Sequence, residues 1–253
     1  MAATNKVFAV ARKDIKEAFS SKSTYIYVIF LLAFMLPYYG ILKDIFGSLS
    51  KRGASMADLL LPGQTLSNIA FYTFPLVLAM LICSIFSAYS IIMDKTKRTL
   101  ESLLATSVSL RQIWLGKTLA VAVPSIVLSL LLSILALVAC NLIIVVPAIG
   151  RFIVPDSLSL AIGLVIIPVM TFLIVLVVNF FQLTMTNPRI ANLIFPGIFI
   201  GIFISTVISL GKSYDFAPTY LKITLIVIGI LIAVNLLLSR FLTKDRVILS
   251  SKG

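Results

Sequence analysis

Six long stretches of this chain carry no charged residue, and they limit its fold more than any other feature of the sequence. A helix that crosses a bilayer needs ~20 mostly apolar residues, and only helices and closed barrels satisfy their backbone in lipid. Even the longest stretch is too short for two such helices and a turn, so each stretch holds one. We therefore predict an all-α membrane protein with six transmembrane helices, near residues 23–42, 69–93, 118–145, 157–182, 190–210 and 222–240.

The composition also favours a chain embedded in a membrane. Only 12% of the 253 residues are charged and 60% are hydrophobic, whereas a soluble domain carries roughly 25% charged residues. The apolar stretches do not alternate in polarity, as the strands of a membrane barrel would. The sequence thus predicts a single transmembrane domain over residues 1–253 in place of a soluble domain.

Lys and Arg are distributed unevenly between the two sides of the predicted spans. Fifteen of the 21 basic residues lie in the N-terminal segment, in the loop at 94–117, at residue 189 and in the C-terminal tail. Because basic residues concentrate on the cytoplasmic side, we predict a multi-pass protein of the cell membrane with both termini in the cytoplasm. The net charge of +12 then reflects this topology and attraction to anionic lipids, and nucleic-acid binding is not expected.

Residues 1–22 are predicted to form an amphipathic helix before the first span. At helical spacing, Phe8, Ala11, Ile15 and Phe19 share one face, and charged residues lie opposite. Such a pattern favours a helix that lies in the plane of the membrane interface.

Several classes of chemistry are excluded or disfavoured. The chain has no His and no G-x-x-x-x-G-K-[ST] motif, so His-ligated metals and ATP hydrolysis by a P-loop are excluded. The interiors of the predicted spans carry no Asp, Glu, Lys or Arg, whereas proton-coupled carriers usually place ionisable groups there. We therefore expect no enzyme activity, no catalytic residue, no metal site and no cofactor bound by this chain.

A few polar side chains remain within the predicted spans. Their ordinary role is to form hydrogen bonds between helices, and contact with a transported solute is the alternative. These residues are Asn141, Asn179, Gln182, Asn192 and Asn235.

The fifth predicted span has two distinct faces. Phe195, Phe199 and Phe203 stand at i, i+4 and i+8 on one side, while Gly197 and Gly201 form a G-x-x-x-G pattern on roughly the opposite side. The glycines permit close packing against another helix. The aromatic side chains face either lipid or a cavity.

The loop at 94–117 is predicted to contain a short amphipathic helix at 97–105. Its apolar face consists of Leu100, Leu103 and Leu104, and its polar face includes Arg98 and Glu101. From the residues alone, this helix either rests on the membrane or docks into a partner protein.

The same loop resembles the E-x-x-x-G-T-L-E-x-L-L-x-T-P-V-S…G-K signature of type-2 ATP-binding-cassette (ABC) permeases. The matching residues are Thr99, Leu100, Glu101, Leu103, Leu104, Thr106, Val108, Ser109, Gly116 and Lys117. Asp94 stands for the first acidic residue, Arg98 stands where the family often has Gly, and Ser107 where it often has Pro. The predicted spans, termini and N-terminal helix extend the similarity over the whole chain.

The resemblance implies a fold like the transmembrane domain of type-2 ABC exporters. It also implies a permease subunit that pairs with a second permease, identical or different, and docks on a separate ATPase subunit that holds ATP and Mg. The loop helix would be the coupling helix, with Lys97, Arg98, Leu100, Glu101, Leu103 and Leu104 in contact with the ATPase. In this family the second and fifth spans line the substrate path, which favours a cavity for Phe195, Phe199 and Phe203; the substrate itself stays open.

Two other functions fit the same residues. A stand-alone channel or facilitative carrier would leave the loop helix resting on lipid, and a non-transporting scaffold would do the same. Co-purification of a soluble ATPase with Walker motifs distinguishes the permease subunit from both.

Overall fold

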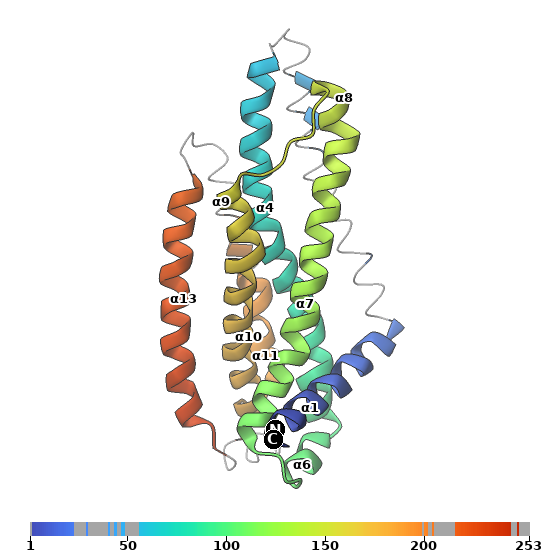
Figure 1. The fold of residues 1–253 in the computed structure, drawn as a ribbon. Coiled ribbons are helices and arrows are strands. Elements are labelled where there is room, and N and C mark those ends of the chain that lie inside the picture. The colour runs from blue at the N-terminus through green and yellow to red at the C-terminus, as the bar shows by residue number, and fades with distance from the viewer. Residues whose placement is uncertain are drawn as a thin grey trace.

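The computed structural model shows long helices that run side by side, with shorter helices at their ends (Figure 1). All regular secondary structure in the described part of the chain is helical. The described residues are 2–22, 29, 40, 43–44, 47–48, 56–198, 200–201, 204, 216–243 and 247.

Four helical stretches of the described chain are long and apolar enough to cross a membrane. They are Gly63–Thr96, Leu110–Ile149, Ser157–Thr184 and Pro218–Phe241. They correspond to four of the predicted spans, and the prediction of an all-helical membrane protein is confirmed to that extent. The span predicted near 23–42 lies almost wholly outside the described residues and the one near 190–210 lies only partly within them, so the number of six spans and the side of each terminus remain predictions.

Three of the four stretches are interrupted by a π-helical turn, a local widening of the helix by one residue. The first stretch joins α4 (Met56–Ser87), a π turn (Ala88–Ile92) and α5 (Met93–Thr96). The second joins α7 (Leu110–Cys140), a π turn (Asn141–Val145) and α8 (Val146–Ile149). The third joins α9 (Ser157–Ala161), a π turn (Ile162–Ile166) and α10 (Ile167–Thr184).

The fourth stretch lies within α13 (Phe216–Phe241). The shorter helices are α1 (Ala2–Ser20), α6 (Thr99–Leu104) and α11 (Pro188–Asn192).

Three of the long helices begin earlier than the spans predicted from the sequence. α4 starts at Met56, α7 at Leu110 and α13 at Phe216, whereas the spans were placed at 69–93, 118–145 and 222–240. A capping box fixes the start of α7, because Ser109 Oγ accepts from the Gln112 amide (3.3 Å) and Gln112 Oε1 accepts from the Ser109 amide (2.9 Å). The charged residues next to the predicted spans therefore lie in continuous helix.

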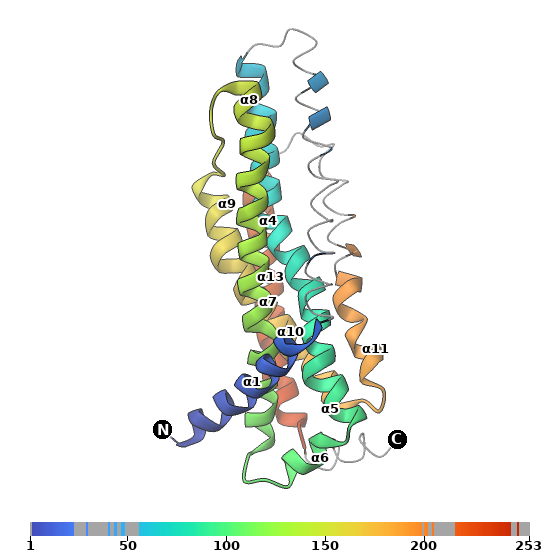
Figure 2. The same ribbon diagram turned by 90° about the vertical axis from the view of Figure 1, so that its right-hand side faces the viewer.

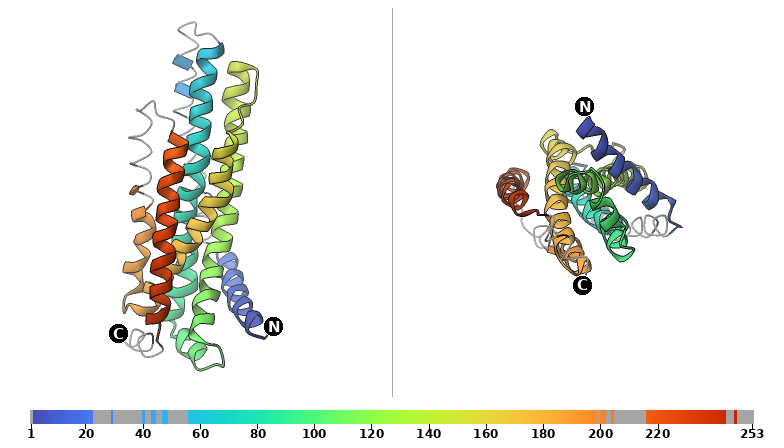
Figure 3. Two further views of the ribbon diagram at one scale, coloured as in Figure 1. Left: turned by 60° about the vertical axis from the view of Figure 1, so that its left-hand side comes forward. Right: turned by 90° about the horizontal axis from the view of Figure 1, so that it is seen from below.

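The core of the described chain lies where α4, α7 and α10 meet. α4 and α10 both pack against α7, and α13 lies beside α10 at the outside of the bundle (Figure 3). Met80 and Ile82 of α4, Val121 of α7 and Val175 of α10 are completely buried there. Most of α13 is exposed, which suits a helix in contact with lipid.

Hydrogen bonds between helices confirm the role predicted for polar residues of the spans at four positions. Gln182 Oε1 accepts from Ser87 Oγ (2.6 Å) and joins α10 to α4. Asn192 Nδ2 donates to Ser84 Oγ (3.1 Å) and joins α11 to α4. Asn179 Nδ2 donates to Thr118 Oγ1 (3.2 Å) and joins α10 to α7. Asn235 Nδ2 donates to the Leu173 carbonyl (3.1 Å) and joins α13 to α10. Such bonds stabilise helix pairs in lipid, where apolar burial alone gives little preference.

Helix α1 packs across the end of α7, next to α6 (Figures 1 and 2). Its buried side carries Val10, Ala11, Asp14 and Ala18. The predicted apolar face is therefore only partly correct, since Ala11 is buried but Phe8 is 61% exposed. α1 thus has one side bound to its own chain, and its location on the membrane surface stays a prediction.

Replacing Gly116 with Ala is expected to push α1 away from α7. A Cβ atom at Gly116 would lie 2.9 Å from Val10 Cβ and 3.0 Å from the Val7 carbonyl oxygen, and overpacking of this kind typically costs about 1–3 kcal/mol. Thermal unfolding of the purified chain measures the loss. Gly229→Ala is the matched control, because a Cβ there meets no described atom within 4 Å. Equal stability of the two variants would contradict the close packing of α1 on α7.

Candidate functional site

Helix α6 lies at the same end of the molecule as α1 (Figures 1 and 2). It follows α5 after a short turn, and residues 105–109 connect it to α7. Thr99–Leu104 falls inside the segment 97–105, so the helix predicted in this loop is confirmed. Its role in coupling stays a prediction.

The apolar side of α6 packs inside this chain. Leu100 is 1% exposed and lies in an apolar cluster with Ile91 and Ile113. Leu103 is partly buried against the same cluster, and the side chain of Leu104 lies outside the described residues. Leu100 therefore anchors α6 to its own chain, and the contact with a partner that the resemblance implied stays a prediction.

The outer side of α6 and of the turns around it is polar and exposed. The exposed residues are Lys97, Arg98, Glu101, Ser102 and Ala105. Lys97, Arg98 and Glu101 are thus the predicted coupling residues that a partner protein can reach directly.

Arg98 has a left-handed backbone conformation, with φ 57° and ψ 18°. This conformation ends the turn after α5 and allows α6 to start in a new direction. It costs an L-residue roughly 1–2 kcal/mol, whereas Gly adopts it freely. The signature's frequent Gly at this position is explained by the same geometry.

A buried ionic cluster lies beneath α6, where α1, α5 and α7 meet. Lys117 Nζ donates to Asp14 Oδ2 (3.0 Å), to Asp94 Oδ2 (2.6 Å) and to the Ser90 carbonyl. Ser90 Oγ donates to the same Asp14 oxygen (2.6 Å). The Lys117 side chain is 0% exposed, and its ammonium group is compensated by these partners. We call Asp14, Ser90, Asp94 and Lys117 the Lys117 cluster.

Three further hydrogen bonds are formed at the two ends of α6. Thr99 Oγ1, at the start of α6, donates to Asp94 Oδ1 (2.6 Å). Beyond its end, Ser107 accepts from Lys6 Nζ of α1, through its carbonyl (3.1 Å) and its Oγ (3.0 Å). α1 therefore contacts the chain on both sides of α6.

The Lys117 cluster was not predicted from the sequence. Lys117 was noted as a match to the permease signature and Asp94 as a departure at its first acidic position, but nothing paired them with Asp14 in the N-terminal helix. Lys95 was likewise counted among the loop charges, yet it is buried, and its Nζ donates to the Met185 carbonyl after α10 (2.6 Å). The sequence contained one signal for this cluster. Asp14 is an acidic residue on the side of an amphipathic helix that becomes buried.

The residues predicted to line a substrate path or to pack helices are only partly described. Phe195 is 0% exposed in the core of the chain, and Phe199 and Phe203 lie outside the described residues. Gly197 and Gly201 are exposed, and a Cβ at either would meet no described atom within 4 Å. A helix packed against these glycines would have to come from outside the described residues or from another chain. The cavity role of the aromatic residues and the packing role of the glycines therefore both remain predictions.

A pocket of about 430 Å³ opens beside the π turn at Ala88–Ile92. It is lined by Ser84, Ile85, Ala88, Tyr89, Ile92, Met93 and Asn192. Asn192 Nδ2 donates to Ser84 Oγ (3.1 Å), and Asn192 Oδ1 accepts from Gln182 Nε2 (3.2 Å). The wall of the pocket is therefore mostly apolar with a fixed polar edge, and it belongs to the second predicted span and the start of the fifth.

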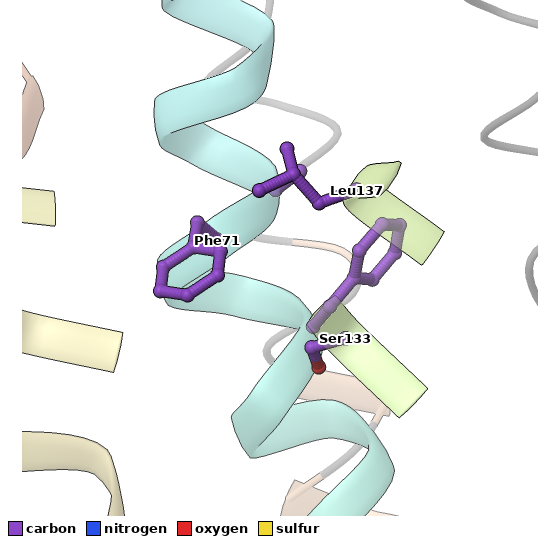
Figure 4. A pocket seen from close by; sticks show the side chains of 5 residues that line it. Phe71, Ser133 and Leu137 are labelled. Carbon is purple, nitrogen blue, oxygen red and sulfur yellow. The ribbon is translucent and has the colours of Figure 1, made fainter. Parts of the chain in front are cut away.

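A second pocket lies between α4 and α7, lined in part by Phe71, Ser133 and Leu137 (Figure 4). Its volume is about 10 Å³, which is close to the minimum for a single water molecule. It is therefore a packing gap and not a site for a solute.

The described residues offer no constellation for catalysis by a metal. No group of three or more Cys, Asp or Glu that could hold a metal ion occurs in the described part. The two cysteines, Cys83 and Cys140, are buried and carry free thiols.

A protein family described as ABC-2 family transporter protein matches residues 20–196. No curated protein and no solved structure matches the chain. The matched range contains α6, the pocket beside the π turn and three members of the Lys117 cluster.

Proposed function

The chain belongs to the ABC-2 family of transporter proteins, and on that premise we propose that it is the permease subunit of an ATP-driven exporter in the cell membrane. A separate ATPase subunit would bind ATP and Mg²⁺ and dock on α6 from the cytoplasm. Closure of the ATPase subunits would then move α6 and switch the access of the substrate path.

The observation that carries this proposal is the construction of α6. A six-residue helix is too short to be stable alone in water, yet this one is anchored by Leu100 and by the bond from Thr99 to Asp94. Its anchor faces the chain while its polar side remains exposed. A helix held in this way is ordered before it meets a partner, and such preorganisation lowers the entropic cost of docking.

The pocket beside the π turn supports an amphiphilic substrate for the same function. Its walls combine apolar side chains with Asn192, whose amide is held in place by Ser84 and Gln182. The exposed glycines, Gly197 and Gly201, would face the second permease subunit. A pair of permeases would then enclose the two pockets.

Placing a large side chain on the exposed side of α6 is expected to block docking of the ATPase. Ser102→Trp adds an indole on the side of α6 where the ATPase subunit would dock. A steric cost of about 1.4 kcal/mol at this contact would lower the affinity for the ATPase subunit about tenfold. The measurement is the amount of ATPase subunit that co-purifies with the permease from native membranes, identified by its Walker motifs and by ATP hydrolysis of the eluate.

Thr186→Trp is the matched control for this experiment. Thr186 is also polar and exposed, but it lies in the turn between α10 and α11. We expect it to retain the ATPase at the wild-type level. Transport by a wild-type chain that retains no ATPase would contradict the proposal and favour a stand-alone channel or carrier.

A further inference from the structure

Helix α1 contacts the α6 segment on both of its sides, although it precedes that segment by about eighty residues of chain. At the start of α6, Thr99 donates to Asp94, and Lys117 of α7 joins Asp94 to Asp14 of α1. After α6, Lys6 donates to Ser107. The direction of α6 is therefore fixed from two sides.

The two attachments differ in character. The Lys117 cluster is buried, with side-chain exposures of 0% for Lys117 and 4% for Asp14. Ion pairs in such surroundings are screened little by salt and have few alternative arrangements. The bonds from Lys6 to Ser107 are exposed, so water competes for them. The buried attachment is expected to control the direction of α6, with the exposed one as a second support.

Asp14 is the only charged residue of α1 that serves this attachment from the buried side. Glu17, one turn further on, is exposed and pairs only loosely with Lys13 (3.8 Å) on the same helix. The Asp14 carboxylate therefore contacts the Lys117 cluster, whereas the Glu17 carboxylate pairs only with its own helix, although both lie on α1.

We propose that Asp14 and Lys117 are positioning residues through which α1 sets the direction of α6 relative to the transmembrane helices. The inference has a consequence that rests on the proposed function: α1 and α6 move as one unit when the ATPase subunit moves α6. Neither residue would touch the ATPase or the substrate. Their effect on coupling would arise from the geometry of α6 alone.

The test measures the direction of α6 in the full-length permease in lipid nanodiscs. Spin labels are placed at Ser102 on α6 and at Thr186 after α10, both exposed, in a chain carrying Cys83→Ala and Cys140→Ala. Labelled chains are mixed with an excess of unlabelled chains so that distances within one chain dominate. The wild-type cluster should give one narrow distance distribution, and Asp14→Asn should lose this single narrow peak.

Two comparisons separate positioning from a general loss of structure. Glu17→Gln removes a carboxylate from the exposed side of α1 and should keep the narrow distribution. Lys6→Met removes the second support and should broaden the distribution less than Asp14→Asn. Should Asp14→Asn fail to assemble, Ser90→Ala, which removes only the hydroxyl that donates to Asp14, decides the test. Distributions as narrow as wild type in Asp14→Asn, or in Ser90→Ala where it decides, would overturn the inference.

Co-purification of the ATPase with the same variants tests the consequence. If α6 has the competent direction only a tenth of the time, the apparent affinity for the ATPase falls about tenfold. A wild-type chain that retains no ATPase would contradict the proposed function, while the spin-label distances would still decide whether α1 positions α6. Full retention by an Asp14→Asn chain with a broadened distribution would overturn the link between this positioning and docking.

Discussion

Replacing Lys117 with Met is expected to lower the free energy of unfolding by about 3–5 kcal/mol, the usual cost of removing one partner from a buried ion pair. The substitution leaves Asp14 and Asp94 close together with no ammonium between them, and their remaining donors are the hydroxyls of Ser90 and Thr99. Two buried carboxylates would then lack the cation that compensates them, which is unfavourable. The expected result is early loss of the contacts that join α1, α5 and α7.

The single tryptophan of the chain reports this loss directly. Trp114 is buried one helical turn before Lys117, and its Nε1 donates to the Leu176 carbonyl (3.0 Å). Its fluorescence should shift to longer wavelength at a lower temperature in Lys117→Met than in wild type. Lys222→Met, at an exposed lysine of α13, serves as the control and should change stability by no more than about 0.5 kcal/mol. Matching transitions in the two variants would contradict the role assigned to the Lys117 cluster.

Truncating Leu100 to Ala is expected to cost about 2–5 kcal/mol, as is typical for a buried leucine whose surroundings collapse only partly. The side chain is 1% exposed and packs in the same apolar cluster as Trp114. Its loss removes the apolar anchor of α6, so α6 should become disordered more easily than the long helices. Trp114 fluorescence again gives the stability, and ATPase co-purification gives the effect on docking.

Leu100→Met is the conservative comparison, because a substitution that nearly conserves volume usually costs less than about 1.5 kcal/mol. Leu103→Ala should fall between the two, since Leu103 is only partly buried. If Leu100→Ala lost ATPase binding at unchanged stability, Leu100 would contact the partner directly and the packing described above would be wrong in the complex.

The apolar spans in the described part of the chain were predictable because lipid imposes a simple rule. A run of apolar residues of the right length has one stable form in a bilayer, and Leu110–Ile149 and Ser157–Thr184 follow it. The starts of α4 and α7 were harder to predict, because a helix continues past the apolar run wherever its backbone is capped. The capping box at Ser109 was visible in the sequence but was not used to extend α7.

The candidate site was predictable only in part, for a different physical reason. The helix at Thr99–Leu104 follows from local periodicity, so its existence could be predicted. The partner of Leu100 could not, since an apolar face gives the same pattern whether it meets lipid, another protein or its own chain. The Lys117 cluster joins residues 14, 94 and 117, and pairing between such distant charges leaves no periodic trace in one sequence.

The three π turns have a consequence for experiments that probe one residue at a time along a helix. Each turn adds one residue to the helix, which shifts the phase of everything beyond it by about 100° relative to an uninterrupted α-helix. A cysteine scan of α4 and its continuation should therefore show accessibility that repeats every 3.6 residues up to Ser87, skips one position across Ala88–Ile92, and resumes out of step from Met93. A helical wheel drawn straight through this span would assign Asp94 to the wrong side of the helix.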